Sequence, residues 1–342
     1  MRAANGNGLA SSISSFRQHR QSYREYFTQL AAAHTTEMVG PMRSEDKLKL
    51  KEHTRYYYER AATETRIKNF WNWGYNSSDT LDEIRKYLPE FALHGDTDGF
   101  SEQLYFAALS QLPGNLEELS GETLLDIGCG PGEGLNFLSR LLPATRMIGL
   151  DLSQNAVGGA NSRFSRGSGL TYVYGDAENV PLDDGEVDVV INIESAHTYP
   201  DHRKFLEEVA RVLKPGGHFT QVDIFADGGK LARTLAVRKE VDGLEWICDK
   251  DISAEVRASI RSRLTPGSYF HRQFQYLPLI LRAYVFRHVS YMFGRSFAGI
   301  PDDNYIKLLR RLRLFRTGLD ENGNVAAIPP GACYRLAVAR KM

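Results

Sequence analysis

The chain has 342 residues, 42% of them hydrophobic and 25% charged, which is typical of a globular protein with one capped domain or two domains. Lys plus Arg and Asp plus Glu both total 42, so we expect a small-molecule partner and no nucleic acid. Charges interrupt every apolar run before the roughly 20 residues of a membrane span, and three cysteines without metal spacing indicate a reducing compartment. We therefore expect a cytoplasmic protein without a membrane span.

The first part of the chain, residues 1–50, is expected to be a polar helical arm. It carries one apolar stripe at helical spacing, formed by Phe16, Tyr23, Phe27 and Leu30. This stripe either packs on its own domain or contacts a neighbouring subunit and makes a homo-oligomer, and both interpretations stay open. Residues 51–118 follow as a helical segment rich in aromatic side chains, which is expected to close the site.

From Glu122 the chain repeats strand, turn and helix, which predicts a parallel sheet between helices. The expected strands are "TLLDIG", "RMIGLDLS", "LTYVYGDA", "VDVVINIES", "GGHFTQVDIF", "LEWICDKDIS" and "CYRLAVARK". Between the fourth and fifth, "DHRKFLEEVARVLKPGG" is expected to be a helix that Pro215, Gly216 and Gly217 stop.

The predicted fold is therefore α/β, with a Rossmann-like, seven-stranded and mostly parallel sheet. We expect the core of this sheet at 119–252, a helical substrate cap at 253–325, and the last strand of the core at 326–342.

The stretch "LLDIGCGPGEG", residues 124–134, joins a strand to a helix through a glycine-rich turn, which suits the anionic end of a ligand. A dinucleotide fingerprint needs glycine three places after Gly130, where this sequence has Glu133. A P-loop needs a lysine, and the turn has none. A ligand that carries a carboxylate instead of a pyrophosphate remains.

This stretch resembles the cofactor-binding motif of the class I S-adenosylmethionine-dependent methyltransferases, and the likeness covers about 120–250. The resemblance implies that S-adenosylmethionine is the cofactor, and it assigns to the first turn Asp126, Gly128, Cys129, Gly130 and Gly132. Asp151, which ends the second strand 19 residues after Gly132, is expected to receive the ribose hydroxyls, and Leu152 to face the adenine. The resemblance also implies that Asp176 and the Ala177 backbone contact the adenine amino edge.

The carboxyl end of the fourth strand, "NIESAHTYPD", resembles the sterol C-methyltransferases that alkylate the sterol tail and, more closely, the phthiotriol-type lipid O-methyltransferases. Both groups take lipophilic acceptors, and within them the sequence also resembles the C-methyltransferase type of teleocidin-like indole terpenoid biosynthesis. "FWNWGY" and "GFSEQLY" are similar to stretches that precede the core in these enzymes. They imply cofactor contacts from Trp73 and Gln103.

Aromatic side chains indicate an apolar acceptor pocket, because residues 264–300 hold nine of them. The side chains predicted to line this pocket are Trp71, Tyr75, Tyr269 and Phe274. Aromatic faces stabilise a carbocation, so we favour transfer of the methyl group to an isoprenoid alkene carbon. The cation then loses a proton or is captured by cyclisation.

A hydroxyl acceptor is the alternative, and it needs a base, for which His197 is best placed, with Glu194 and Tyr199 as secondary candidates. A regulator that binds the cofactor without turnover is a further alternative. His197, Asp201 and His202 form a poor metal set, so we predict no metal.

The N-terminal stripe can be tested by deleting residues 1–40. If the stripe contacts a second subunit, the deletion should lower the mass measured by light scattering while the sheet stays folded. An unchanged mass favours packing of the arm on its own domain.

Overall fold

The computed structural model describes residues 43–63, 72–91, 98–225, 227–265, 267–268, 294, 297–300 and 331–342. In these ranges, seven strands form one sheet with the order β3-β2-β1-β4-β5-β7-β6. The strands are β1 (Thr123–Ile127), β2 (Arg146–Asp151), β3 (Leu170–Tyr174), β4 (Val187–Ile193), β5 (Leu213–Phe225), β6 (Leu244–Asp251) and β7 (Cys333–Lys341).

The strands from β3 to β5 are parallel, whereas β7 lies antiparallel between β5 and β6. The strand order reverses between β1 and β4, and ligands of such sheets bind beyond the carboxyl ends of the strands at this reversal. The predicted α/β fold with a seven-stranded, mostly parallel sheet is confirmed.

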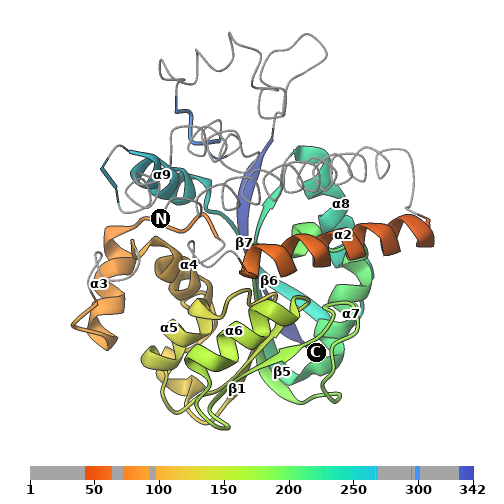
Figure 1. The fold of residues 1–342 in the computed structure, drawn as a ribbon, viewed down its shortest axis with the longest axis horizontal. Helices are drawn as coiled ribbons and strands as arrows, with labels where there is room; N and C mark the ends of the chain where they lie inside the picture. Colours follow the sequence, from red (N-terminus) through yellow and green to blue (C-terminus); the bar gives the residue numbers. More distant parts are fainter. Residues whose placement is uncertain are drawn as a thin grey trace, which may run out of the picture.

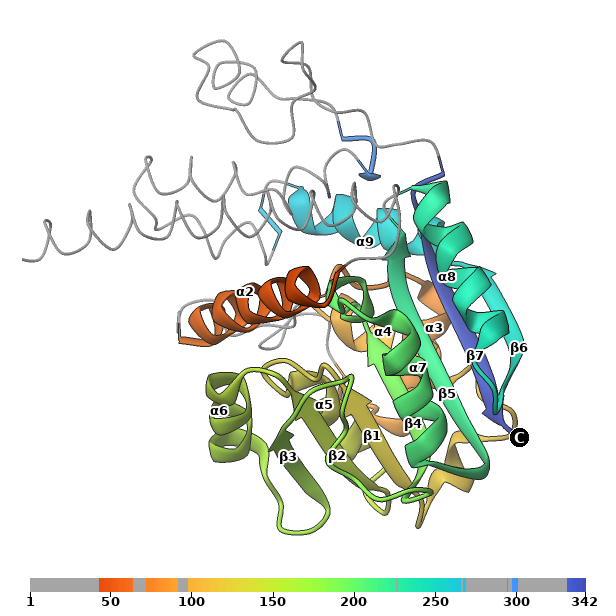
Figure 2. The ribbon, with the colours of Figure 1, turned by 90° about the vertical axis from the view of Figure 1, so that its right-hand side faces the viewer.

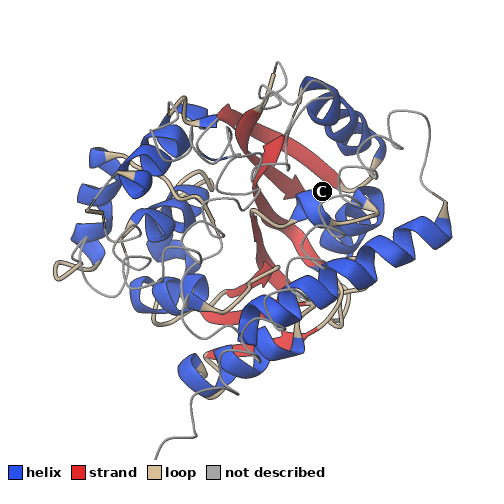
Figure 3. Cartoon of the chain, turned by 45° about the horizontal axis from the view of Figure 1, so that its top comes forward, coloured by secondary structure: helices blue, strands red, loops and turns tan. Residues whose placement is uncertain are grey.

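Helices cover both faces of this sheet (Figure 3). They are α2 (Ser44–Thr63), α3 (Ser78–Tyr87), α4 (Phe100–Leu109), α5 (Glu133–Leu141), α6 (Gln154–Phe164), α7 (His202–Val212), α8 (Gly228–Glu240) and α9 (Ser253–Leu264), with short 3-10 helices η1 (Leu116–Leu119) and η2 (Ala196–Thr198). One face packs on α3, α4, α5, α6 and α9, and the other packs on α7 and α8. None of the described helices is both long and apolar enough to cross a lipid bilayer.

Helix α2 lies across the carboxyl ends of the strands, above the end of the sheet that carries β1, β2 and β4 (Figures 1 and 2). It begins at Ser44 and continues to Thr63, so the predicted boundary between residues 50 and 51 falls inside one helix. The apolar stripe predicted for the arm lies outside the described residues. The other domain boundaries stay predictions.

The helix predicted before β5 is confirmed as α7, which ends just before Pro215. Helix α7 ends at Val212, and β5 begins at Leu213, before Pro215. Val187 pairs with Leu213 and Val189 pairs with His218, so residues 214–217 of β5, which include the proline and both glycines, are extra residues in the pairing with β4. The proline and both glycines therefore follow the end of the helix, as predicted, and also form the irregular start of the strand.

The close packing of α5 on α4 generates a prediction about Gly134. A methyl group at Gly134 would overlap the ring of Tyr105, whereas nothing lies within 4 Å of the same position at Gly158 in α6. Gly134→Ala should lower the free energy of unfolding by about 1–3 kcal/mol, because the buried ring must move. Gly158→Ala, the matched control, should raise it by about 0.5–1 kcal/mol through helix propensity. Urea unfolding of both variants measures the difference, and equal effects would contradict the close contact.

Candidate functional site

The turn after β1 is built so that no side chain fits at its first glycine. Gly128 has a φ of 81°, and a methyl group there would overlap the Ser195 hydroxyl and lie 2.8 Å from the Tyr199 hydroxyl. The backbone N–H groups of Gly128 and Cys129 donate to the Leu150 carbonyl at 2.7 and 3.0 Å. The turn is thus held between the ends of β2 and β4, with its backbone facing the pocket.

Asp151 fixes the position of this turn from the end of β2. One carboxylate oxygen accepts the Gly130 N–H at 2.8 Å, and the other accepts the Ser153 N–H at 2.8 Å. Burial raises the pKa of Asp151 to about 6, although these backbone donors act against the rise. At neutral pH the side chain is therefore a carboxylate with free acceptor positions beside the turn.

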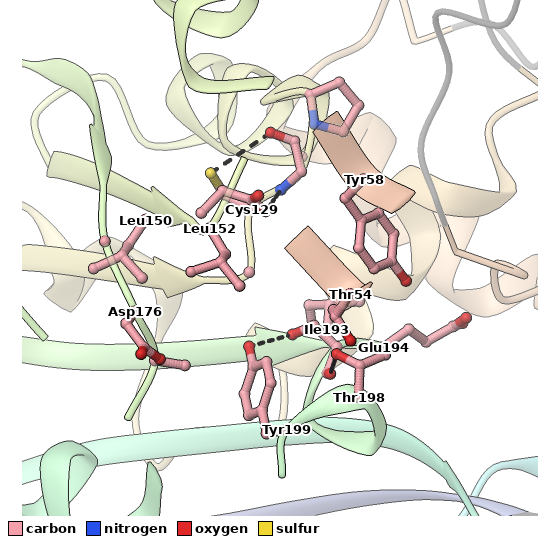
Figure 4. Close-up of a pocket in the computed structure, with 18 of the residues that line it drawn as sticks. Thr54, Tyr58, Cys129, Leu150, Leu152, Asp176, Ile193, Glu194, Thr198 and Tyr199 are labelled. Carbon is pink, nitrogen blue, oxygen red and sulfur yellow. Dashed lines mark hydrogen bonds between the residues drawn. The ribbon is translucent and has the colours of Figure 1, made fainter. Parts of the chain in front are cut away.

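A pocket opens beyond the turn, and it brings together most of the residues assigned to the cofactor (Figure 4). Those that line it are Gly128, Cys129, Gly130, Asp151, Leu152, Asp176 and Ala177. They come from the ends of β1, β2 and β3, which supports one common ligand for all of them. Their individual roles stay proposals.

Four residues assigned to the cofactor do not line this pocket. Asp126 is fully buried below the turn, accepts the Tyr105 hydroxyl at 3.1 Å, and has a pKa that burial raises to about 8. The Gln103 side chain accepts the Ser77 N–H at 3.0 Å and donates to the Gly99 carbonyl, so it links α3 to α4.

The other two contribute through the backbone. The Gly132 carbonyl accepts the Tyr172 hydroxyl at 2.8 Å, and the Trp73 N–H donates to Glu194 at 2.9 Å. All four residues therefore make contacts that hold neighbouring segments of the site in place. Direct contacts between them and the cofactor stay predictions.

Glu194 stands at the end of β4 in a left-handed backbone conformation, with a φ of 50°. Its buried carboxyl accepts the Trp73 N–H and lies 3.4 Å from the Tyr334 hydroxyl, and burial raises its pKa to about 8. A non-glycine residue with this backbone is strained, and such strain gathers at functional sites. Glu194 also lines the pocket, so at neutral pH it presents a mainly protonated carboxyl there.

Tyr199, after β4, also lines the pocket, and its hydroxyl bonds to two neighbours. It is 2.9 Å from the Ser195 hydroxyl and accepts the Asn192 side-chain amide at 3.1 Å. Burial raises the pKa of Tyr199 above its ordinary value, so the group stays protonated at neutral pH. These contacts describe a support for the glycine turn and do not provide a base.

His197, on η2, does not line the pocket itself, although its neighbour Thr198 does, and it forms a pair that the sequence analysis did not predict. Its Nδ1 lies 2.7 Å from a carboxylate oxygen of Asp223, near the end of β5. Asp223 is buried, which acts to raise its pKa, but His197 and Lys230 outweigh burial and lower it. The carboxylate therefore stays ionised and orients the imidazole. A buried acidic residue close to the end of a predicted central strand was the only sequence signal for this partner.

Sequence reasoning also missed a wall of the pocket that α2 provides through Lys51, Thr54 and Tyr58. These residues stand at positions i, i+3 and i+7, which put them on one face of a helix. This spacing was visible in the sequence, but nothing local indicates which element the face covers. Tyr75 lies outside the pocket lining, where its N–H donates to the Phe100 carbonyl at 2.9 Å. Trp71, Tyr269 and Phe274 lie outside the described residues.

Comparisons with known proteins agree on one family. A family model described as a methyltransferase domain matches residues 125–221. The probable phthiotriol/phenolphthiotriol dimycocerosates methyltransferase 2 of Mycobacterium ulcerans (strain Agy99) is 36% identical over 216 residues, 63% of this chain and 77% of that protein. The fatty-acid O-methyltransferase of Mycolicibacterium smegmatis (strain ATCC 700084 / mc(2)155) is 34% identical over 161 residues, 45% of this chain and 52% of that protein.

A solved structure shows the same fold. The geranyl diphosphate C-methyltransferase from Streptomyces coelicolor A3(2), in complex with Mg2+, geranyl diphosphate and S-adenosyl-L-homocysteine, aligns with a TM-score of 0.53 and 16% identity. The alignment covers 89% of this chain and 100% of that protein. At this identity the likeness concerns the fold alone.

The environment of Asp151 predicts a pH dependence of S-adenosylmethionine binding. If Asp151 binds the ribose, as the sequence resemblance implies, only its carboxylate can accept both hydroxyls, so affinity should rise as pH increases through about 6 and fall as the group is protonated below that value. Asp151→Ala should weaken binding at least tenfold at pH 7.5, or about 1.4 kcal/mol, and should abolish this dependence. Calorimetry at pH 5.5, 6.5 and 7.5 tests both effects. Unchanged affinity in the variant would remove Asp151 from the site.

Proposed function

We propose that this protein, which belongs to the S-adenosylmethionine-dependent methyltransferases in the family of the phthiotriol-type enzymes, methylates a hydroxyl of a lipophilic small molecule. The names of the two relatives, which refer to phthiotriol dimycocerosates and fatty acids, support a lipid-like acceptor. Cytoplasmic localisation and a homo-oligomer stay part of the same proposal.

The pair of His197 and Asp223 is the observation that favours oxygen as the methyl acceptor. The methyl group leaves a positive sulfur by in-line displacement, and a hydroxyl acceptor must lose its proton as the new bond forms. Because Nδ1 faces the ionised Asp223, this nitrogen is the donor and Nε2 is the acceptor. A base that a carboxylate orients is the arrangement that proton removal needs.

Transfer to an isoprenoid alkene carbon is the second candidate, and the aromatic composition of residues 264–300 favours it. In that reaction the alkene attacks the methyl group without a base, and a carbocation results that aromatic faces stabilise. The cation then loses a proton, for which His197 is again available, or closes a ring. A regulator that binds the cofactor without turnover is distinguished by the absence of product with every acceptor.

Variants of the pair separate the two candidates. If oxygen is methylated, His197→Ala should lower kcat by roughly 10²–10⁴, because the proton has no acceptor. Asp223→Asn should lower kcat at least tenfold and shift the pH profile, while S-adenosylmethionine affinity stays within twofold. His218→Ala, five residues before Asp223 on β5 and outside the pocket lining, is the control and should leave turnover unchanged.

If an alkene carbon is methylated, turnover should depend less on His197 than on the aromatic residues that line the pocket, Tyr58 and Tyr199. At saturating S-adenosylmethionine, Tyr58→Ala or Tyr199→Ala should then cost more than His197→Ala, with products of altered proton loss or ring closure. Product mass and NMR after incubation with fatty alcohols, phenolic lipids and prenylated acceptors decide between these outcomes. A carbon-methylated product of the wild type would overturn the oxygen proposal and leave the family unchanged.

A further inference from the structure

Helix α2 is held on the cofactor pocket by charged contacts along its length. Lys51 donates to Asp176 at 2.7 Å and to Glu178 at 2.5 Å, and Lys47 donates to Asp201 at 2.6 Å. Further along the helix, Glu59 accepts the backbone N–H groups of Gln154 and Asn155 at the start of α6. The helix is thereby tied to three segments that follow strands β2, β3 and β4.

The contacts of Lys51 involve the adenine end of the pocket. Its partner Asp176 follows β3, and the side chain of Glu178 is only 7% exposed. Burial opposes the charge on Lys51, yet the two carboxylates outweigh it and raise the lysine pKa. Each oxygen of Asp176 accepts one hydrogen bond, from Lys51 or from the Glu178 N–H, and keeps room for another. Lys51 can thus orient Asp176 and leave it able to accept the adenine amino group.

Thr54, one turn further along α2, has a feature that folding alone does not explain. Thr54 is 6% exposed and lines the pocket, and its hydroxyl has no hydrogen-bond partner among the described residues. Leaving a buried hydroxyl unpaired costs free energy, so such a group is expected to pair with a ligand. Figure 4 labels Thr54 and Tyr58 of α2 among the residues that line the pocket.

We propose that α2 is a cofactor-binding element, in which the Thr54 hydroxyl bonds to S-adenosylmethionine and Lys51 positions Asp176 and holds the helix closed over the adenosine. The proposal rests on the cofactor part of the proposed function and is independent of the acceptor. It follows that the cofactor enters and leaves when Lys51 separates from its two carboxylates. Lys51 is a positioning residue in this account, whereas Thr54 contacts the cofactor.

Thr54→Val provides the sharpest test, because it removes the hydroxyl and keeps the shape of the side chain. In the full-length protein without ligand, its Tm should be unchanged or higher, since no hydrogen bond is lost. Its Kd for S-adenosyl-L-homocysteine, measured by calorimetry without an acceptor, should increase about three- to tenfold. A Kd within twofold of the wild type would overturn the contact.

Lys51→Met is compared with Lys47→Met. The second variant removes the same charge one turn earlier on α2, where Lys47 bonds to Asp201, and neither of these two residues lines the pocket. Lys51→Met should raise the Kd for S-adenosyl-L-homocysteine at least tenfold and increase its dissociation rate in stopped flow. Lys51→Arg should restore most of the affinity, and Lys47→Met should change it less than twofold. Equal losses in both methionine variants would overturn the positioning role, because they would reflect general loosening of α2.

The wild type serves as the reference for the proposed function itself. If the wild type fails to bind S-adenosyl-L-homocysteine, the cofactor assignment fails and this inference fails with it. If the wild type binds and the variants match it, only the inference fails.

Discussion

The absence of room for a side chain at Gly128 is the constraint on which the site depends. The hydroxyls of Ser195 and Tyr199, both after β4, occupy the space where a Cβ would lie, and the Gly128 N–H bonds to the end of β2. Asp151 completes the arrangement through the Gly130 N–H. The N–H groups of Gly128, Cys129 and Gly130 are thus all bonded within the protein, and the turn is held in one fixed geometry beside the pocket. A turn that is ordered before a ligand arrives lowers the cost of ordering on binding.

Buried carboxyl groups surround this turn, and their different pKa values divide their roles. Asp151, with a pKa of about 6, is ionised at neutral pH and suits hydroxyl donors, whereas Glu194, with a pKa of about 8, is mainly neutral. A second full negative charge in the pocket would stabilise the positive sulfonium of the bound cofactor at least as much as it stabilises the transition state. An interaction that stabilises both states equally does not lower the barrier to methyl transfer. A protonated Glu194 retains its contacts with Trp73 and Tyr334 without this effect.

Two of the contacts at the carboxyl ends of the strands join distant parts of the sequence. Lys51 of α2 pairs with Asp176 after β3, and Asp223 of β5 pairs with His197 after β4. Arg263 of α9 bonds to Asp98, in the segment before α4, and to the carbonyl of Asn72, which lines the pocket. These long-range pairs are partly buried, so removing one partner leaves an uncompensated charge that is costly in the folded state.

The sequence by itself determined the strands, the glycine turn and the residues after β2 and β3, because each is a local pattern of apolar runs, glycines and acids. The apolar pattern of "CYRLAVARK" also predicted β7, since a buried strand has the same pattern whichever strands it pairs with. Only the tertiary structure decided that Gln103 bonds to Ser77, that Tyr199 supports the turn, and that Asp223 faces His197. It likewise decided that α2 covers the pocket through Lys51 and Thr54. Such pairings depend on which elements meet in space, and residues more than 100 positions apart, such as Lys51 and Asp176, carry no local signal of their contact.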